Sequence, residues 1–169
     1  MSLQLPSRPA QYFIDEVLLP GWDATGAGGL DINATPTDSG FVPVATSIDD
    51  VGAVYPSLII QYSNETSGGE STYSFMTQEG AGQNRQGTLI ATARAQDSQD
   101  GYEGMDAEDA TVALIEEVEN VCQRQAAAPD TQFQHLGSQR GPDAPDDYEE
   151  DPTVRLATTQ VSYSWLRTP

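Results

Sequence analysis

The sequence predicts an α+β domain, in which a mainly antiparallel sheet of about four to five strands packs against one long helix. Two observations support this fold class. Residues 87–97 alternate with a period of two, placing Leu89 and three alanines on one face and more polar residues on the other. Residues 106–125 then change to a helical period, which predicts a helix laid against that strand.

The charge of the chain is its most unusual property. The 169 residues include 26 acidic and 7 basic ones, all of the basic ones arginine, for a net charge of −19. Such a surface repels itself at low ionic strength, whereas molar salt shortens the Debye length to about 3 Å. The composition therefore predicts a halophilic protein of the haloarchaeal type rather than an acidic mesophilic one. It also argues against binding to nucleic-acid phosphates, which requires clusters of Lys and Arg.

Cysteine use and hydropathy exclude several other classes. Cys122 is the only cysteine, so no disulfide can form within the chain and no CxxC metal site exists. The first residues lack a basic stretch followed by an apolar run, and no apolar run approaches the roughly 18 residues of a membrane span. We therefore expect no signal peptide, no membrane association and synthesis in the cytoplasm.

We expect a single domain over residues 1–169, beginning with an N-terminal helix in residues 1–20. Pro9 stands at the first helical position, apolar residues follow at helical spacing, and Pro20 precedes a glycine that ends the segment. This helix is expected either to pack on the core or to dock a neighbouring subunit.

Residues 21–56 are rich in Gly, Thr, Asp and Pro and predict an extended loop or arm, with short strands near Ile32 and at 41–44. The glycine-rich stretch at 26–29 has no following Lys-Ser/Thr, which excludes a P-loop, and its context argues against a dinucleotide fingerprint. Arms of this kind reach across to partners, so Trp22 and Phe41 are interface candidates; a plain surface loop is the alternative.

The α+β core is expected over residues 57–169. Residues 57–64 and 71–78 predict two strands joined as a hairpin, and residues 80–86 link this hairpin to the strand at 87–97. The hairpin tip, with Gly68 and Gly69, and the link, with Arg85, are further candidate contacts to neighbouring subunits.

The second half of the core combines the long helix with two more strands. Apolar residues of 106–125 face the sheet and Cys122 is expected to be buried, whereas Glu116, Glu117, Glu119 and Arg124 are expected to lie mostly outward. Residues 131–136 predict a short strand. Residues 153–166 give the longest strand signal, and its core face is marked by Val161, Tyr163 and Trp165.

Residues 137–152 form an acidic loop between these two strands. Their like charges prevent close packing and predict a flexible lobe, with weak cation binding as the alternative. The candidate ligands are Asp143, Asp146, Asp147, Glu149, Glu150 and Asp151. No cofactor and no resident metal ion is expected.

The residues of the chain do not assemble a recognisable catalytic set. His135 is the only histidine, and it lies far from any nucleophile motif, so nucleophilic catalysis lacks its base. Pairs of carboxylates carry little information in a chain this acidic. We therefore do not expect an enzyme.

The order of elements resembles the tail terminator and tail-completion family of long-tailed viruses. The resemblance covers residues 57–167, and rests on the hairpin, the segment 85–93, the single long helix and the closing strand at 155–163 after a variable loop. In that family the middle strand has a small polar entry followed by alternating aliphatic residues. The resemblance implies a protein without an active site that forms a hexameric ring between the head–tail connector and the tail tube.

Together with the halophilic composition, the resemblance implies a structural virion protein in the neck of a haloarchaeal virus, assembled in the host cytoplasm. The implied partners are other copies of the chain, the tail tube protein and the connector or adaptor proteins. DNA passes through such a ring without sequence-specific binding. Arg94 is the first candidate for a contact with a neighbour's acids. The alternatives are another neck component, such as a head-completion or connector protein, and a non-viral halophilic binding module.

Overall fold

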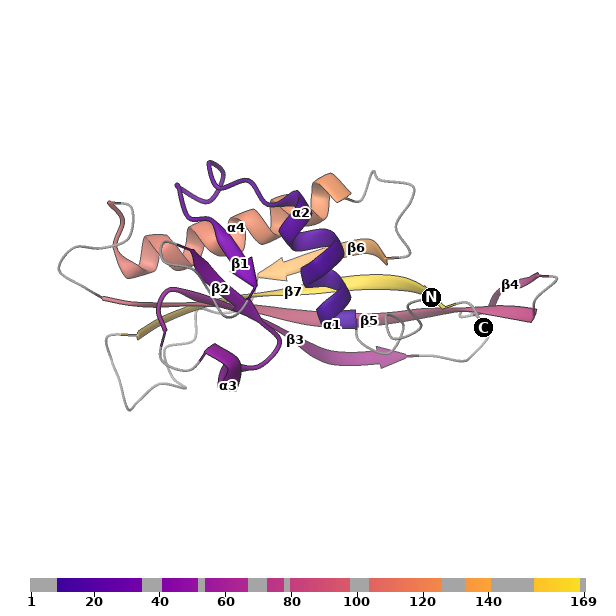
Figure 1. Cartoon of the computed structure of the whole chain (residues 1–169). Helices are drawn as coiled ribbons and strands as arrows, with labels where there is room; N and C mark the ends of the chain where they lie inside the picture. The colour runs from indigo at the N-terminus through magenta and orange to yellow at the C-terminus, as the bar shows by residue number, and fades with distance from the viewer. Residues whose placement is uncertain are drawn as a thin grey trace.

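The computed structural model describes residues 9–34, 41–51, 54–66, 73–77, 80–97, 104–125, 133–140 and 154–167. The strands of these segments form one sheet (Figure 1). The long helix α4 (Ala107–Gln125) and an N-terminal helical segment cover one face of this sheet, and the short helix α3 (Ile48–Val51) lies on the other. We call these the helix side and the open side of the sheet.

The predicted N-terminal helix is confirmed, but its centre is wound more loosely than an α-helix. It consists of α1 (Pro9–Tyr12), the π-helix η2 (Phe13–Leu18) and α2 (Leu19–Gly21). The backbone N–H of Leu19 donates to the carbonyl of Ile14, five residues earlier. The apolar residues of η2 are buried against the core, so this helix packs within its own subunit.

The sheet is mixed, and its strands lie in the order β1-β2-β3-β5-β7-β6, with β4 pairing only with β5. Strands β1, β2 and β3 run parallel, and the remaining pairs are antiparallel. The strands are β1 (Ile32–Ala34), β2 (Val42–Ala45), β3 (Ser57–Thr66), β4 (Tyr73–Thr77), β5 (Gly80–Gln96), β6 (Phe133–Arg140) and β7 (Val154–Arg167).

The prediction of a mainly antiparallel sheet of four to five strands is therefore wrong. Residues 21–56, expected to form an extended arm, instead supply β1 and β2 and extend the sheet with parallel strands. All four residues of β2 are buried, so the strand shows no alternation of polar and apolar residues. Pro43 lies where β2 pairs with β1 only, so its missing N–H is tolerated inside the sheet.

The predicted hairpin between residues 57–64 and 71–78 is also wrong. Strand β3 pairs with β2 and β5, whereas β4 pairs with the first residues of β5. Residues 80–86, expected to be a link, are part of β5, which is 17 residues long. The hairpin of this region is therefore β4–β5.

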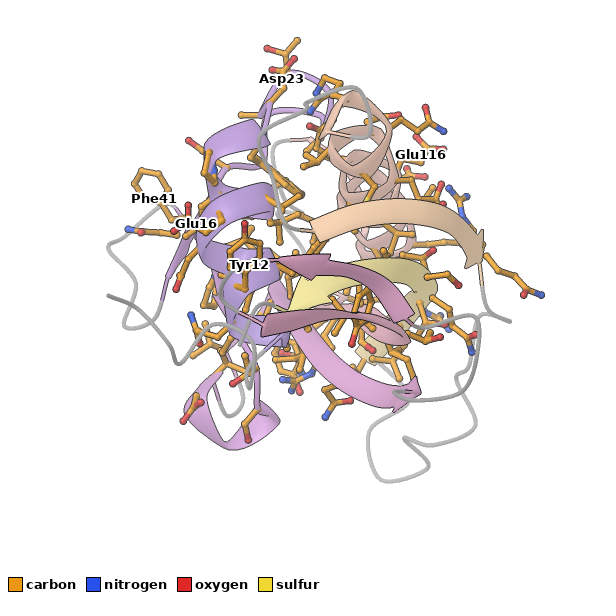
Figure 2. All side chains as sticks on the ribbon, turned by 90° about the vertical axis from the view of Figure 1, so that its right-hand side faces the viewer. Tyr12, Glu16, Asp23, Phe41 and Glu116 are labelled. Atoms are coloured by element: carbon orange, nitrogen blue, oxygen red, sulfur yellow. The ribbon has the colours of Figure 1, made fainter. Side chains whose placement is uncertain are left out.

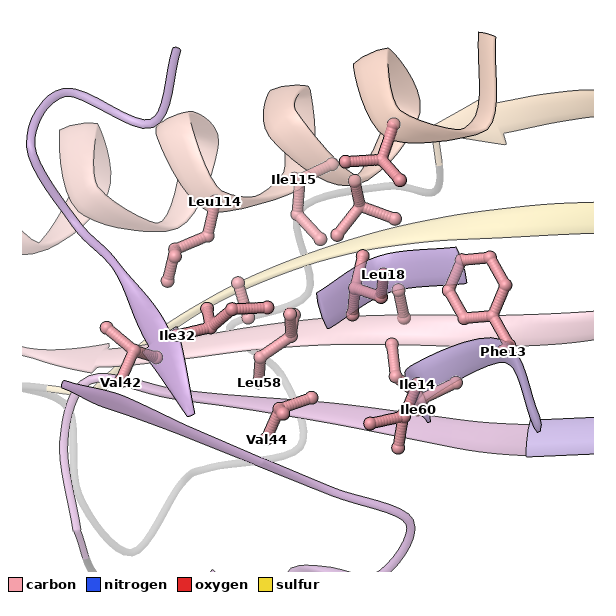
Figure 3. Close-up of a cluster of buried hydrophobic side chains, with 14 of the residues drawn as sticks. Phe13, Ile14, Leu18, Ile32, Val42, Val44, Leu58, Ile60, Leu114 and Ile115 are labelled. Atoms are coloured by element: carbon pink, nitrogen blue, oxygen red, sulfur yellow. The ribbon is translucent and has the colours of Figure 1, made fainter. Parts of the chain in front are cut away.

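The alternation in β5 is confirmed, and it builds the core on the helix side (Figure 3). Leu89, Ala91, Ala93 and Ala95 are buried beneath the helices. The predicted long helix is confirmed as α4, which presents Leu114 and Ile115 to this surface. Among the described helices, none has the length and apolar character needed to cross a bilayer.

Glu117 of α4 corrects the expectation that the acidic residues of this helix point outward. Its side chain is fully buried, and it accepts hydrogen bonds from the backbone N–H of Asp23 at 2.9 Å and from the guanidinium of Arg124. Arg124 also donates to the carbonyl of Gly21 at 2.7 Å. These contacts tie the turn after the N-terminal helix to α4, and we call them the Glu117 clamp.

Cys122 is buried in α4, as expected, and provides a reporter of folding. Burial, with a smaller contribution from Glu119, raises the pKa of its thiol from 9.0 to about 12. We predict that a thiol-specific reagent at pH 8 will label native protein very slowly and unfolded protein quickly, because only the exposed chain has an accessible thiol that ionises readily. Since the folded pKa is raised, the thiol adds stability below pH 9 that is lost as the pH rises towards 12. Rapid labelling of native protein would contradict the burial of this residue.

Candidate interaction surfaces

The open side of the sheet carries uncharged residues between its strands β3, β5, β7 and β6. The pairing register places Thr92 beside Thr158, and Ile90 between Gln61 and Gln160. We call this surface the uncharged face. Its residues are Gln61, Thr88, Ile90, Thr92, Gln139, Thr158, Gln160 and Ser162.

The side chains of the uncharged face are accessible to different degrees. Gln61, Gln139, Gln160 and Ser162 are exposed, and the threonines and Ile90 are half-buried. At the β2–β3 end the open side is covered by α3, where Val51 packs with Ala45 and Ile59. The uncharged face is therefore the part of the open side away from α3.

The same register continues this character along the strands. Neighbouring positions of the open side are occupied by Asn64, Asn84, Gln86 and Ser164. No aspartate or glutamate occupies an open-side position of β3, β5, β6 or β7 within the residues that the structure describes. In a chain of net charge −19, this is the surface that another protein can approach with the least electrostatic repulsion.

The helix side has the opposite chemistry. Figure 2 shows Glu16, Asp23 and Glu116 among the helices that cover the sheet. The exposed acids of this layer are Asp15, Glu16, Asp23, Glu108, Asp109 and Glu116. The two sides of the sheet therefore differ in charge, and the subunit has two chemically distinct surfaces.

Arg94, the first sequence candidate for a contact with a neighbour, is buried in its own subunit. Its residue exposure is 3%, its guanidinium carbon lies 4.9 Å from the centre of the Tyr55 ring, and its Nη2 donates to the Tyr55 hydroxyl at 3.1 Å. Tyr55 precedes β3, so the loop after α3 covers the end of the open side where Arg94 lies. The expectation that Arg94 is an accessible interface residue is therefore wrong.

Trp22 and Phe41 differ in their surroundings. Trp22 is half-buried against the core and its indole N–H donates to the carbonyl of Leu30 at 3.0 Å, so it holds the turn after α2 in place. Phe41 is 40% exposed just before β2 and points away from the sheet (Figure 2). Of these two predicted contacts, Phe41 is the accessible one.

The remaining candidates lie on the sheet end or outside the described residues. Arg85 is in β5, directly opposite Trp165 of β7. Gly68 and Gly69 lie outside the described segments, as do the candidate cation ligands Asp143, Asp146, Asp147, Glu149, Glu150 and Asp151. Within the described part of the chain, no group of three or more His, Cys, Asp or Glu side chains could hold a metal ion.

The sequence candidates did not include the residues of the uncharged face. Their signal was present in the alternation of β5 and β7, where every second residue is Thr, Gln, Ser or Ile. Only the pairing register shows that these positions lie side by side across the strands. No protein-family model matches the chain, and a search of curated proteins finds no match to it.

Proposed function

We propose that the protein is a structural, self-assembling component of a virion neck, which forms a ring that terminates the tail tube and joins it to the head–tail connector. The observation that carries this proposal is the uncharged face, which lies opposite a helix layer with exposed acids. Interface centres are depleted in charged residues, and an uncharged surface can be buried without desolvating carboxylates.

A ring also requires that each subunit present two different surfaces. Head-to-tail contacts join one surface to another and close into a ring when the rotation between neighbours divides a full turn. The charge difference between the helix side and the open side provides such a pair of unlike surfaces. A hexamer is the stoichiometry that the sequence resemblance implies, and a negatively charged lumen would let DNA pass without adhering.

The alternative is a halophilic binding module that remains a monomer. The same uncharged face would then receive a different protein, and the chain alone would show no concentration-dependent association. A mass measurement on the purified chain in molar KCl separates the two functions.

We predict that Gln160→Glu weakens self-association at least tenfold. The substitution places a carboxylate in the middle of the uncharged face, where assembly would have to bury it without a partner, at a cost of about 1–3 kcal/mol. Sedimentation velocity across a concentration series in molar KCl measures the effect.

The matched control is Gln123→Glu, which makes the same chemical change on the exposed surface of α4. It should leave association unchanged, and slow labelling of Cys122 should show that both variants are folded. Equal association of wild type, Gln160→Glu and Gln123→Glu would exclude the uncharged face as the assembly surface.

A further inference from the structure

One end of the sheet extends past the helices that cover the rest of it. Figure 1 shows β4 and the adjoining end of β5 projecting beyond the helix layer. We call this end the ribbon. It consists of β4, residues 80–86 of β5, residues 164–167 of β7 and residues 133–135 of β6.

The register places aromatic and cationic residues together on the helix-side face of the ribbon. Tyr163, which is buried on the helix side, fixes the face, because residues two apart in a strand share a side. Trp165 is therefore on the same side, and it pairs with Arg85 on one neighbouring strand and Phe133 on the other. The further positions of this face are Tyr73, Gln83, His135 and Arg167.

This grouping is unusual for the chain. The described side chains of four other arginines all contact groups of their own subunit: Arg94 with Tyr55, Arg124 with Glu117, Arg140 with Glu119 and Arg155 with Asp97. Two of the remaining arginines, Arg85 and Arg167, occupy ribbon positions beside a tryptophan. Tryptophan, tyrosine and arginine are the residues most enriched at the energetic centres of protein interfaces.

We propose that the ribbon of one subunit lies against the uncharged face of a second copy, with its helix-side face inward. This inference rests on the proposed function, and names the segment that occupies the surface described there. The orientation follows from the fold, since the ribbon extends past its own helix layer and the uncharged face is the part of the open side away from α3. Subunits joined in this way overlap head to tail.

Charge decides between the surfaces of a second copy that could occupy the uncharged face. The helix layer would bring exposed acids such as Glu108 and Glu116 against an uncharged surface, which removes their hydration without providing cations. The ribbon instead brings arginines, whose N–H groups can donate to the side-chain carbonyls of Gln61 and Gln160. Glu65, opposite Gly87, lies at the base of the ribbon.

Cross-linking between introduced cysteines tests the contact directly, because Cys122 is the only native cysteine. In a Cys122→Ala background, one variant carries Gln83→Cys on the ribbon and another carries Gln160→Cys on the uncharged face. A short bis-maleimide in molar KCl should join the two variants when they are mixed, and should join neither variant to itself. Gln123→Cys on α4 is the control and should not cross-link to Gln83→Cys.

The outcomes separate this inference from the proposed function. If wild type assembles but the mixture of Gln83→Cys and Gln160→Cys gives no cross-link, the ribbon contact is wrong and self-assembly stands. Cross-linking of Gln160→Cys to itself would show two uncharged faces packed together and would overturn the ribbon contact. A wild type that stays monomeric overturns both proposals.

A second variant tests the aromatic centre of the ribbon. Trp165→Ala should weaken association at least tenfold while Cys122 stays protected from thiol reagents, which shows that the fold is kept. Unchanged association of the folded variant would overturn the inference. A ribbon that binds a single-stranded oligonucleotide in molar KCl, and loses this binding in Trp165→Ala while assembly is unaffected, would assign the ribbon to nucleic acid instead.

Discussion

Replacing Glu117 by Ala is expected to lower the free energy of unfolding by about 3 kcal/mol, near the lower end of the range for breaking a buried ion pair. The carboxylate is fully buried, and its loss leaves the N–H of Asp23 without its acceptor. The other partner, Arg124, has a side chain that is 47% exposed and can regain hydration, which is why the cost is not larger. Denaturant unfolding in molar KCl, followed by labelling of Cys122, measures the change.

Gly26 provides an independent test of the same clamp. A Cβ at this position would lie 2.4 Å from Oε1 of Glu117, and that carboxylate is held by Asp23 and Arg124, so it cannot easily move aside. Gly26→Ala should therefore destabilise the protein by about 1–3 kcal/mol. In the Glu117→Ala background the obstruction is gone, and Gly26→Ala should cost almost nothing.

The control for this double-mutant cycle is Gly137→Ala in β6. Nothing lies within 4 Å of the Cβ that this change would add, so its effect should be close to zero in both backgrounds. Additive effects of Gly26→Ala and Glu117→Ala would contradict the close approach between the turn and α4.

Lowering the salt concentration should unfold the wild-type protein. At about 10 mM salt the Debye length is about 30 Å, comparable to the size of the domain, so the carboxylates of a chain with net charge −19 repel one another across the whole molecule. This repulsion is expected to remove most of the roughly 5–15 kcal/mol that stabilises an ordinary domain. In molar KCl the same charges interact only over about 3 Å and the fold is retained.

The labelling rate of Cys122 at a series of KCl concentrations measures this dependence, since the thiol is buried only in the folded chain. Sucrose without salt is the control, because it favours compact states by exclusion from the surface but does not screen charge. Equal protection of Cys122 at 10 mM and at molar KCl would contradict the halophilic interpretation of the composition.

The sequence was sufficient to predict those elements whose pattern is local. The alternation in β5 and β7 and the helical period of α4 appear within single segments, and the structure has each of them in place. Burial of Val161 and Tyr163 confirms the expected core face of β7. These elements pack by a single face, so their periodicity reports directly on their surroundings.

The parallel part of the sheet could not be predicted in this way. Strands β1 and β2 are three and four residues long, and β2 is buried on both faces, so neither has a periodic pattern. Their pairing depends on contacts with β3 that no local segment specifies. The same holds for β4, whose partner β5 was chosen by register rather than by proximity to the preceding strand.

The candidate surfaces show a similar division. The sequence identified Arg85 and Phe41 as interface candidates, but Arg94 was misjudged, because the loop containing Tyr55 folds over it. Glu117 was expected outside, because its pattern on α4 does not reveal the turn at Asp23 that covers it. The uncharged face required the pairing of several strands to become visible.

The mass of the wild-type chain in molar KCl tests the central claim most directly. Sedimentation equilibrium over a wide concentration range should give one closed oligomer, with six times the chain mass of 18.1 kDa as the expected value, and negative-stain images should show rings. A protein that remains at the mass of a single chain at every concentration, while Cys122 stays protected, would contradict the account.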